Sequence, residues 1–245
     1  MNLHIRPEHI LAKKGEISDK VVIAGDPDRI KKLSSLLVSP KLVNDNRHFL
    51  VYTGEYGGEK VTLAAHGIGS PSLAIVVEEL ISLGARSIIR LGTAGSLSKD
   101  LKVGDILIPN SAGFVQGGTI GQYFKDISIS PAPDYSLLSA LVKNARSSAN
   151  RFSVGPVFSS DAFYAERSMS SQLNAAGFMG VEMECSMLFA LGQLRRVKTA
   201  SALLIIDDTL KGSRFVTPEK IRKTALTVAK IVLDSLVHEK TPDSI

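Results

Sequence analysis

The chain has very little cysteine and no tryptophan: Cys185 is the one thiol in 245 residues. A single cysteine excludes an intramolecular disulfide framework and any zinc site built on several cysteines. Aromatic residues make up only 6% of the chain, and lysine and arginine are scattered, although the net charge is +5. A nucleic-acid partner is therefore not indicated, whereas a small anionic substrate suits the mildly basic balance.

Long apolar runs are missing too. No segment approaches the roughly 18 consecutive apolar residues of a membrane span, and residues 1–7 hold no apolar core of a signal peptide. From these absences we expect a cytoplasmic protein with no membrane partner. The content of 44% hydrophobic and 22% charged residues is ordinary for a globular protein, and the length allows a full-sized core.

Expected strands and helices alternate along the chain, and no linker, repeat or low-complexity segment divides them. Apolar runs of strand length cover residues 20–24, 50–52, 60–65, 87–91, 104–109, 152–158 and 198–206. Helical spacing covers residues 28–37, 71–83, 134–149, 181–194 and 218–237. This alternation predicts the α/β class: one domain over residues 1–245, with helix layers on both faces of a central mixed sheet.

Glycine and arginine residues follow two of the expected strands. A turn is predicted at residues 92–95, directly after the strand that ends in Arg90; Gly25 follows the first strand, with Arg29 one turn into the next helix. Such folds bind ligands at the carboxyl ends of strands, where glycine lets backbone N–H groups come close. Because an arginine fork matches phosphate or carboxylate, an anion site is one interpretation, and surface ion pairs are the other. Dinucleotides and nucleoside triphosphates are poorly supported, since neither G-x-G-x-x-G nor a P-loop is present.

Carboxylates stand beside apolar segments at two further places. Glu182 and Glu184 open the expected helix at 181–194, and Asp207 and Asp208 end an apolar strand. Placing a carboxylate among apolar residues costs free energy unless it is exposed, paired with a cation or hydrogen-bonded to hydroxyls. The glutamates could bind two vicinal sugar hydroxyls or simply favour the helix N-terminus. Strand alternation points the two aspartates in opposite directions, so one could act as a general acid while the other caps a turn.

Together these residues resemble the trimeric-to-hexameric nucleoside phosphorylases, the group that holds bacterial-type purine nucleoside phosphorylase, methylthioadenosine phosphorylase and uridine phosphorylase. The resemblance covers nearly the whole chain, and it implies a nucleoside phosphorylase-like fold. It rests on Gly25-Asp-Pro-x-Arg29, Asn46-Arg47, His66-Gly-Ile-Gly-Ser-Pro71, Arg90-x-Gly-Thr93, Ser160-Asp-x-Phe-Tyr164, Val181-Glu-Met-Glu184 and Asp208.

The resemblance implies a phosphate site that two subunits share. Its ligands from one chain would be Gly25, Arg29, Arg90 and Thr93. Arg47 would reach in from a neighbouring subunit, and His9, again from the neighbour, would lie near the ribose 5′ position. The implied assembly is a homohexamer, a trimer of dimers. Taken alone, His9 and Arg47 would be ordinary surface residues, and His66 is expected to be structural rather than catalytic.

The nucleoside side of the site is implied in the same way. Met183 and Glu184 would hold the ribose hydroxyls, and Phe163 would stack against the base with Glu182 close by. Asp208 would donate a proton or hydrogen bond to purine N7. Phosphate would attack the anomeric carbon through a transition state of oxocarbenium character, releasing the base and ribose 1-phosphate. Inorganic phosphate is a co-substrate, and neither a metal nor an organic cofactor is required.

Asp208 favours the purine branch, because the uridine phosphorylases resembled here lack an acid at that position. The expected substrates are inosine, adenosine and guanosine, with 5′-methylthioadenosine as a further candidate. Gln116-Gly-Gly118 most resembles archaeal members that accept methylthioadenosine. Arg167, three residues after Tyr164, keeps uridine phosphorylase as an alternative.

A nucleosidase on the same fold is a second alternative, since it would use water and would not need the three arginines. Asp207 departs from the family pattern, in which serine usually precedes the acid. Such a change could alter the preference between 6-amino and 6-oxo purines. The basic residue that supports the acid is left open between Lys211, Arg214, Lys220 and Arg222.

Overall fold

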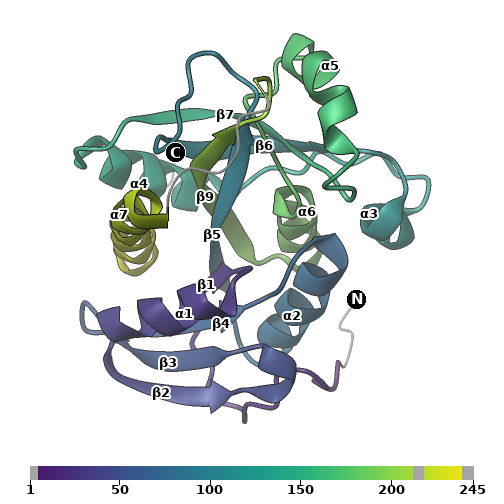
Figure 1. Ribbon diagram of the computed structural model, residues 1–245. Helices are drawn as coiled ribbons and strands as arrows, with labels where there is room; N and C mark the ends of the chain where they lie inside the picture. The colour runs from purple at the N-terminus through teal and green to yellow at the C-terminus, as the bar shows by residue number, and fades with distance from the viewer. Residues whose placement is uncertain (1–4, 212–217, 239–245) are drawn as a thin grey trace, which may run out of the picture.

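Nine strands form one sheet in the computed structural model, which describes residues 5–211 and 218–238 (Figure 1). The strands are β1 (Lys20–Ala24), β2 (Val38–Asn44), β3 (Val51–Tyr56), β4 (Glu59–Ala65), β5 (Ser87–Ser96), β6 (Ile106–Phe114), β7 (Phe152–Ser159), β8 (Gly180–Glu182) and β9 (Lys198–Asp208). Their order is β2-β3-β4-β1-β5-β8-β7-β6-β9, with a further pairing of β9 to β5. This extra pairing closes the strands from β5 to β9 into a ring, and it mixes parallel with antiparallel neighbours.

Helices cover both faces of the sheet (Figure 1). They are α1 (Pro27–Leu33), α2 (Ser70–Ser82), α3 (Gly118–Phe124), α4 (Tyr135–Arg146), α5 (Ser170–Ala175), α6 (Cys185–Arg195) and α7 (Pro218–Val237). Single-turn 3₁₀ segments are η1 (Ser34–Leu36), η2 (Asn46–His48) and η3 (Glu166–Met169). Within the described residues, no helix combines the length and apolarity that a bilayer crossing needs.

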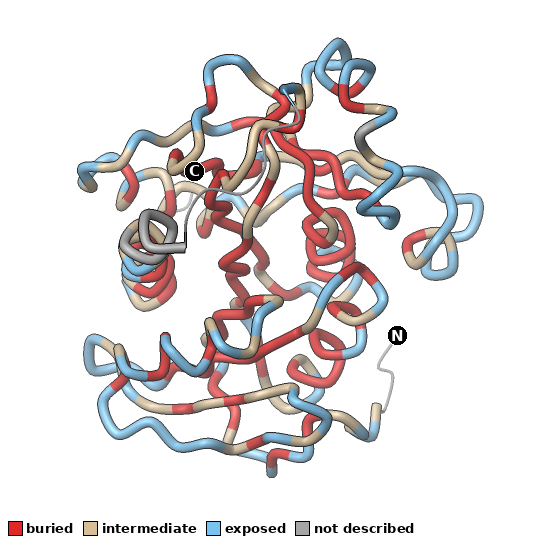
Figure 2. Tube along the Cα trace, in the orientation of Figure 1, coloured by how far each residue is buried: buried red, intermediate tan, exposed pale blue. Residues whose placement is uncertain are grey.

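Two buried cores lie on opposite faces of the sheet, because successive strand residues point to opposite sides. On β1, Val21 and Ile23 pack in the core with α2 and α6, whereas Val22 and Ala24 pack in the core with α1, α4 and α7. Figure 2 shows the buried strands running through the centre between exposed outer loops. The predicted α/β class, its central mixed sheet and its helix layers on both faces are confirmed.

Four neighbouring strands run parallel and end at one edge of the sheet. The register pairs Ala24 of β1 with Ala65 of β4, and Ile23 of β1 with Arg90 of β5; β5 in turn pairs in parallel with β9. The residues that follow β1 and β4, and the last residues of β5 and β9, therefore meet at this edge. Most of the residues that the sequence motifs single out belong to it.

Two local predictions are wrong. Residues 92–95 form no turn, since β5 runs on to Ser96 and pairs with β9 along this stretch. Glu182 does not open a helix but ends β8, and α6 begins at Cys185 with Glu184 as its N-cap. In both cases pairing between strands far apart in the sequence overrides the local signal of glycine or of helical spacing.

Candidate active site

Arg90 pairs with two glutamates in the interior of the structure. Its Nη1 lies 3.1 Å from Glu182 Oε2, and its Nη2 contacts Glu184 Oε2. All three side chains are almost fully buried. Burial alone would lower the pKa of Arg90, but the Glu184 and Glu182 charges outweigh it and raise that pKa. Breaking such a buried pair by removing one partner leaves an uncompensated charge, so the three groups act as a unit.

The Glu182 carboxylate is also the anchor of α6. It accepts hydrogen bonds from the backbone nitrogens of Glu184 and Cys185, each at 2.9 Å, and from the Ser159 hydroxyl. A carboxylate at a helix N-terminus satisfies amides that have no partner within the helix. With Arg90 as a fourth partner, Glu182 ties β5, β7 and α6 together. Its implied place beside the base stays a prediction.

Glu184 meets the turn between β4 and α2. Gly69 donates its backbone N–H to Glu184 Oε1 at 2.7 Å, with a φ of 84° that favours glycine. The Ser70 hydroxyl bonds to the carbonyl of the half-buried Met183 at 3.1 Å. Burial raises the pKa of Glu184 more than the charge of Arg90 lowers it. The structure thus brings Met183 and Glu184, the predicted ribose ligands, to the start of α6 and next to Arg90.

The predicted phosphate ligands of one chain gather along the same edge. Gly25 follows β1, and a Cβ there would lie 2.7 Å from the carbonyl oxygen of Gly67, so no larger residue fits without a shift. Arg29 lies in α1 and donates to the carbonyl of Leu91 on β5 at 3.4 Å. Burial lowers the pKa of Arg29, the Asp26 charge opposes this and the Arg90 charge adds to it. Thr93 is half-buried on β5, three residues after Arg90.

The two residues predicted to serve a neighbouring subunit lie on adjacent segments. His9 Nδ1 lies 2.8 Å from Glu79 Oε1, and the carbonyl of His9 accepts a hydrogen bond from Asn46 Nδ2 at 3.1 Å. Arg47 follows Asn46, is exposed and has a φ of 53°. The structure therefore brings these segments together at the surface. Whether they complete a neighbour's site stays a prediction.

The aromatic and acidic residues predicted to bind the base differ in their surroundings. Phe163 is 47% exposed and packs edge-on against Tyr164, which is 94% exposed, so Phe163 is not an ordinary core residue. Asp208 Oδ2 lies 2.8 Å from Lys211 Nζ, and Lys211 holds the pKa of Asp208 below its usual range. Of the four basic candidates, Lys211 is thus a partner of the acid, and the side chains of Arg214, Lys220 and Arg222 lie outside the described part.

The Asp207 carboxylate lies against Gly95 of β5. A Cβ at Gly95 would lie 2.6 Å from Asp207 Oδ1 and 2.2 Å from Thr209 Oγ1. The space beside Gly95 is therefore filled by the Asp207 carboxylate and the Thr209 hydroxyl. This position places Asp207 against the strand that carries Arg90 and Thr93.

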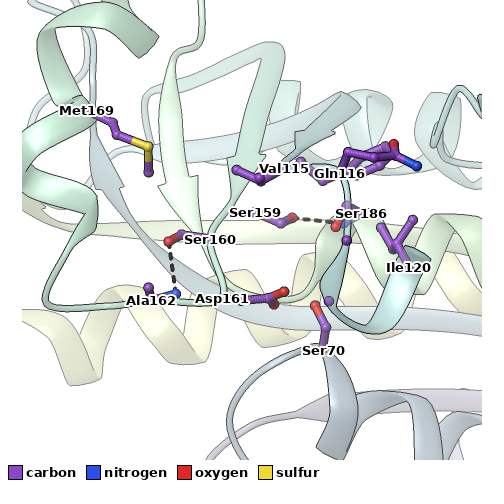
Figure 3. Close-up of a pocket in the computed structure, with 13 residues that line it drawn as sticks. Ser70, Val115, Gln116, Ile120, Ser159, Ser160, Asp161, Ala162, Met169 and Ser186 are labelled. Atoms are coloured by element: carbon purple, nitrogen blue, oxygen red, sulfur yellow. Dashed lines mark hydrogen bonds between the residues drawn. The ribbon is translucent and has the colours of Figure 1, made fainter. Parts of the chain in front are cut away.

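A cavity of about 340 Å³ is lined in part by Ser159, the hydrogen-bond partner of Glu182. Figure 3 shows the side chains that surround it. Serines from three elements line it: Ser70 of α2, Ser159 of β7 and Ser186 of α6. Ser159 links the cavity wall to Glu182, and it accepts a hydrogen bond from the backbone nitrogen of Ser186 at 2.9 Å. Ser160, Asp161 and Gln116 add to its polar lining.

These cavity residues were not among the predicted site residues. Two signals could have found them, the Ser160-Asp-x-Phe-Tyr164 motif and the Gln116-Gly-Gly118 stretch, since both segments line the cavity. Over residues 5–211 and 218–238, no three histidine, cysteine, aspartate or glutamate side chains gather as a metal site would need.

Comparison with known proteins adds three findings. A family model described as the phosphorylase superfamily matches residues 19–238. A DeoD-type purine nucleoside phosphorylase of Roseobacter denitrificans is 35% identical over 93% of this chain and 97% of its own, and a guanosine phosphorylase of Halorubrum lacusprofundi is 32% identical over the same shares. Among solved structures, a uridine phosphorylase of Vibrio fischeri superposes with a TM-score of 0.87 at 26% identity, over 97% of this chain and 99% of that one.

Proposed function

The chain belongs to the phosphorylase superfamily, and from this premise we propose that it cleaves purine nucleosides with inorganic phosphate, releasing the free base and ribose 1-phosphate. Relatives named as purine nucleoside phosphorylases, at about a third identity over almost the whole chain, support the purine branch. The proposed substrates are inosine, adenosine and guanosine, and 5′-methylthioadenosine is to be tested beside them. Phosphate is the nucleophile, so the proposed chemistry asks for no metal or organic cofactor.

The observation that carries this proposal is the contact between Arg90 and Glu184. An arginine suits a phosphate dianion, and a buried carboxylate suits vicinal hydroxyls of a sugar. Phosphorolysis needs the attacking oxygen within about 3–3.5 Å of the anomeric carbon. If Arg90 binds phosphate and Glu184 binds ribose, their contact would bring the two substrates close to that separation.

In the proposed mechanism, cationic and backbone groups hold phosphate under the ribose. Arg29, Arg90, the Gly25 amide and the Thr93 hydroxyl would bind the dianion, and Arg47 would join them from a neighbouring subunit. As the bond to the base breaks, the sugar gains oxocarbenium character, which the phosphate charge and Glu184 would stabilise. Oriented binding of both substrates supplies a large share of such rate enhancements.

Departure of the base would depend on the end of β9 and on the exposed aromatic pair. Phe163 would stack on the purine with Glu182 close by, and Met183 would lie against the ribose. Asp208 would give a proton or hydrogen bond to N7, which makes the purine a better leaving group. Its pairing with Lys211 favours the carboxylate, so proton donation would require that this pair loosens when the base binds.

The proposed working form is a homohexamer, built as a trimer of dimers. His9 would contribute to the neighbour's ribose 5′ end and Arg47 to its phosphate. The adjacency of their segments at the surface and the exposure of Arg47 support this assembly. An exposed arginine is accessible to a contact with another subunit.

Uridine phosphorolysis is the second candidate, because a uridine phosphorylase superposes over nearly the whole chain. Base release distinguishes the candidates when it is followed from inosine, adenosine, guanosine, 5′-methylthioadenosine and uridine, with and without phosphate. We expect purine release only with phosphate. In Asp208→Asn we expect kcat/KM for purine nucleosides to fall by roughly 10²–10⁴-fold, the usual contribution of an acid in general acid–base catalysis.

Asp100→Asn is the matched control, because Asp100 is exposed on a loop outside the site. It should leave kcat/KM unchanged. Release of base without phosphate would identify a nucleosidase and remove the role of the arginines. Turnover of uridine alone would identify the other branch of the family.

A further inference from the structure

His66 is fully buried, and neither of its ring nitrogens has a hydrogen-bond partner among the described residues. Its backbone is well satisfied, since its N–H donates to Ala24 at 2.9 Å and its carbonyl accepts from Ser72 at 2.6 Å. A buried polar group without a partner is costly, and in native structures such a group calls for an explanation. The imidazole is therefore held by the backbone in a place where it lacks a partner of its own.

The His66 ring lies at the edge of the sheet that carries the proposed phosphate ligands. His66 directly follows β4, Gly25 follows β1 and Arg90 lies on β5, and these three strands are neighbours in the order β4-β1-β5. A Cβ on Gly25 would lie 3.6 Å from His66 Cε1. Burial lowers the pKa of His66 well below its usual value, and the charges of Arg90 and Arg29 lower it further, outweighing backbone contacts at His66 and Gly67 that raise it. The imidazole is thus neutral, with one N–H donor and one acceptor nitrogen.

The proposed phosphate ligands are nearly all donors. The guanidinium groups of Arg29, Arg47 and Arg90 cannot accept a hydrogen bond, and neither can the amide of Gly25. Hydrogen phosphate at neutral pH carries one P–OH group, which needs an acceptor. The Thr93 hydroxyl can both accept and donate, whereas Glu184 already receives the hydrogen bonds of Gly69 and Arg90. A neutral imidazole at the same edge supplies a second acceptor beside the Thr93 hydroxyl, in a set that otherwise consists of donors.

We infer that His66 accepts a hydrogen bond from the P–OH group of bound hydrogen phosphate, and that it thereby selects phosphate over sulfate, which has no such proton at neutral pH. This inference rests on the proposed function, because it concerns the same phosphate site. Since the ring is fully buried, the contact requires a covering side chain to turn aside. Arg29 is half-buried on α1 and its charge acts on the ring, so we expect this side chain to move.

The test compares phosphate with sulfate in the wild type and in His66→Leu, which removes the acceptor. Binding of each anion is followed by titration calorimetry, and KM for phosphate and for inosine by initial rates. We expect the wild type to bind phosphate at least about tenfold more tightly than sulfate, as one hydrogen bond to a charged group implies. In His66→Leu, KM for phosphate should rise by about that factor while sulfate binding and KM for inosine stay unchanged.

Three further variants separate this role from a structural one. His66→Asn or His66→Gln keeps an amide acceptor and should restore part of the preference, and His238→Leu, exposed at the end of α7, should change nothing. Equal weakening of phosphate and sulfate in His66→Leu would overturn the inference in favour of packing. If His66→Leu does not fold, equal binding of the two anions by the wild type overturns it directly. If phosphate binds with the expected preference but no base is released, the proposed function fails while the inference stands.

Discussion

Lys211 donates two hydrogen bonds to Asp208, one from Nζ to Oδ2 at 2.8 Å and one from its backbone nitrogen to Oδ1 at 3.1 Å. The hydrogen bond from the Lys211 side chain is the main reason why the pKa of Asp208 lies below its usual value. An acid that must be protonated to act works only below its pKa. In the free protein the pair with Lys211 therefore lowers the upper pH limit at which Asp208 holds the proton that the proposed reaction needs.

Lys211→Ala should move that limit upward. Without the ammonium group, the pKa of Asp208 rises toward its usual value, so the alkaline limb of kcat/KM for inosine shifts to higher pH. The measurement is a pH–rate profile of both proteins, with Lys99→Ala, an exposed lysine on another loop, as the control. An unchanged alkaline limb would show that another group sets it.

Glu182→Ala should destabilise the protein strongly. The change leaves Arg90 with one carboxylate and removes the partner of two backbone amides at the start of α6. Breaking a buried charge pair in this way costs about 3–5 kcal/mol. The free energy of unfolding in urea measures the effect. In contrast, Glu59→Ala removes the exposed pair with Lys20 and should cost at most about 1 kcal/mol.

Glu79 should make stability depend on pH. Burial would raise the pKa of Glu79, but hydrogen bonds from the His9 ring and from the amides of residues 8–10 outweigh it and lower the pKa. Because the folded pKa lies below the unfolded one, the stabilisation is complete above the unfolded pKa and is lost as pH falls through the folded pKa. The stability difference between wild type and Glu79→Gln should therefore be largest near neutral pH and shrink in acid. A pH-independent difference in the free energy of unfolding would contradict this.

Gly95→Ala should damage the site through a steric conflict. Its methyl group would fall 2.2 Å from Thr209 Oγ1 and 2.6 Å from Asp207 Oδ1, so both side chains would have to move. Overpacking of this kind costs about 1–3 kcal/mol, and we expect kcat/KM to fall with it. Gly121→Ala in α3 is the matched control, since a Cβ there meets no atom within 4 Å. Thermal unfolding and initial rates of the two variants test the contrast.

Much of the fold could be predicted because its signals are local. The apolar runs that became β1, β4 and β7 begin and end close to their predicted limits, since buried strands need continuous apolar residues. Glycine at position 25 likewise indicated a close backbone approach, which the Gly67 carbonyl provides. The strand β2 was missed because its residues are mostly exposed and carry no apolar pattern.

The errors arose where distant segments compete with local ones. The glycines at positions 92 and 95 suggested a turn, yet ladder pairing with β9 keeps them in β5. Helical spacing suggested that Glu182 opens a helix, yet pairing with β5 and β7 holds it in β8. No local pattern reports a strand partner that lies tens of residues away.

The sequence by itself determined the class of the fold and the edge of the sheet that carries the polar residues. It also determined the family that those residues resemble, because periodicity and motifs depend on residues close together in the chain. Only the tertiary structure decided which charged side chains form ion pairs. It paired Arg90 with Glu182 and Glu184, joined Asp208 to Lys211, and left the buried ring of His66 without a partner among the described residues. Such relations depend on how strands register and helices pack, and the free energy of a buried charge is set by its neighbours in space rather than in sequence.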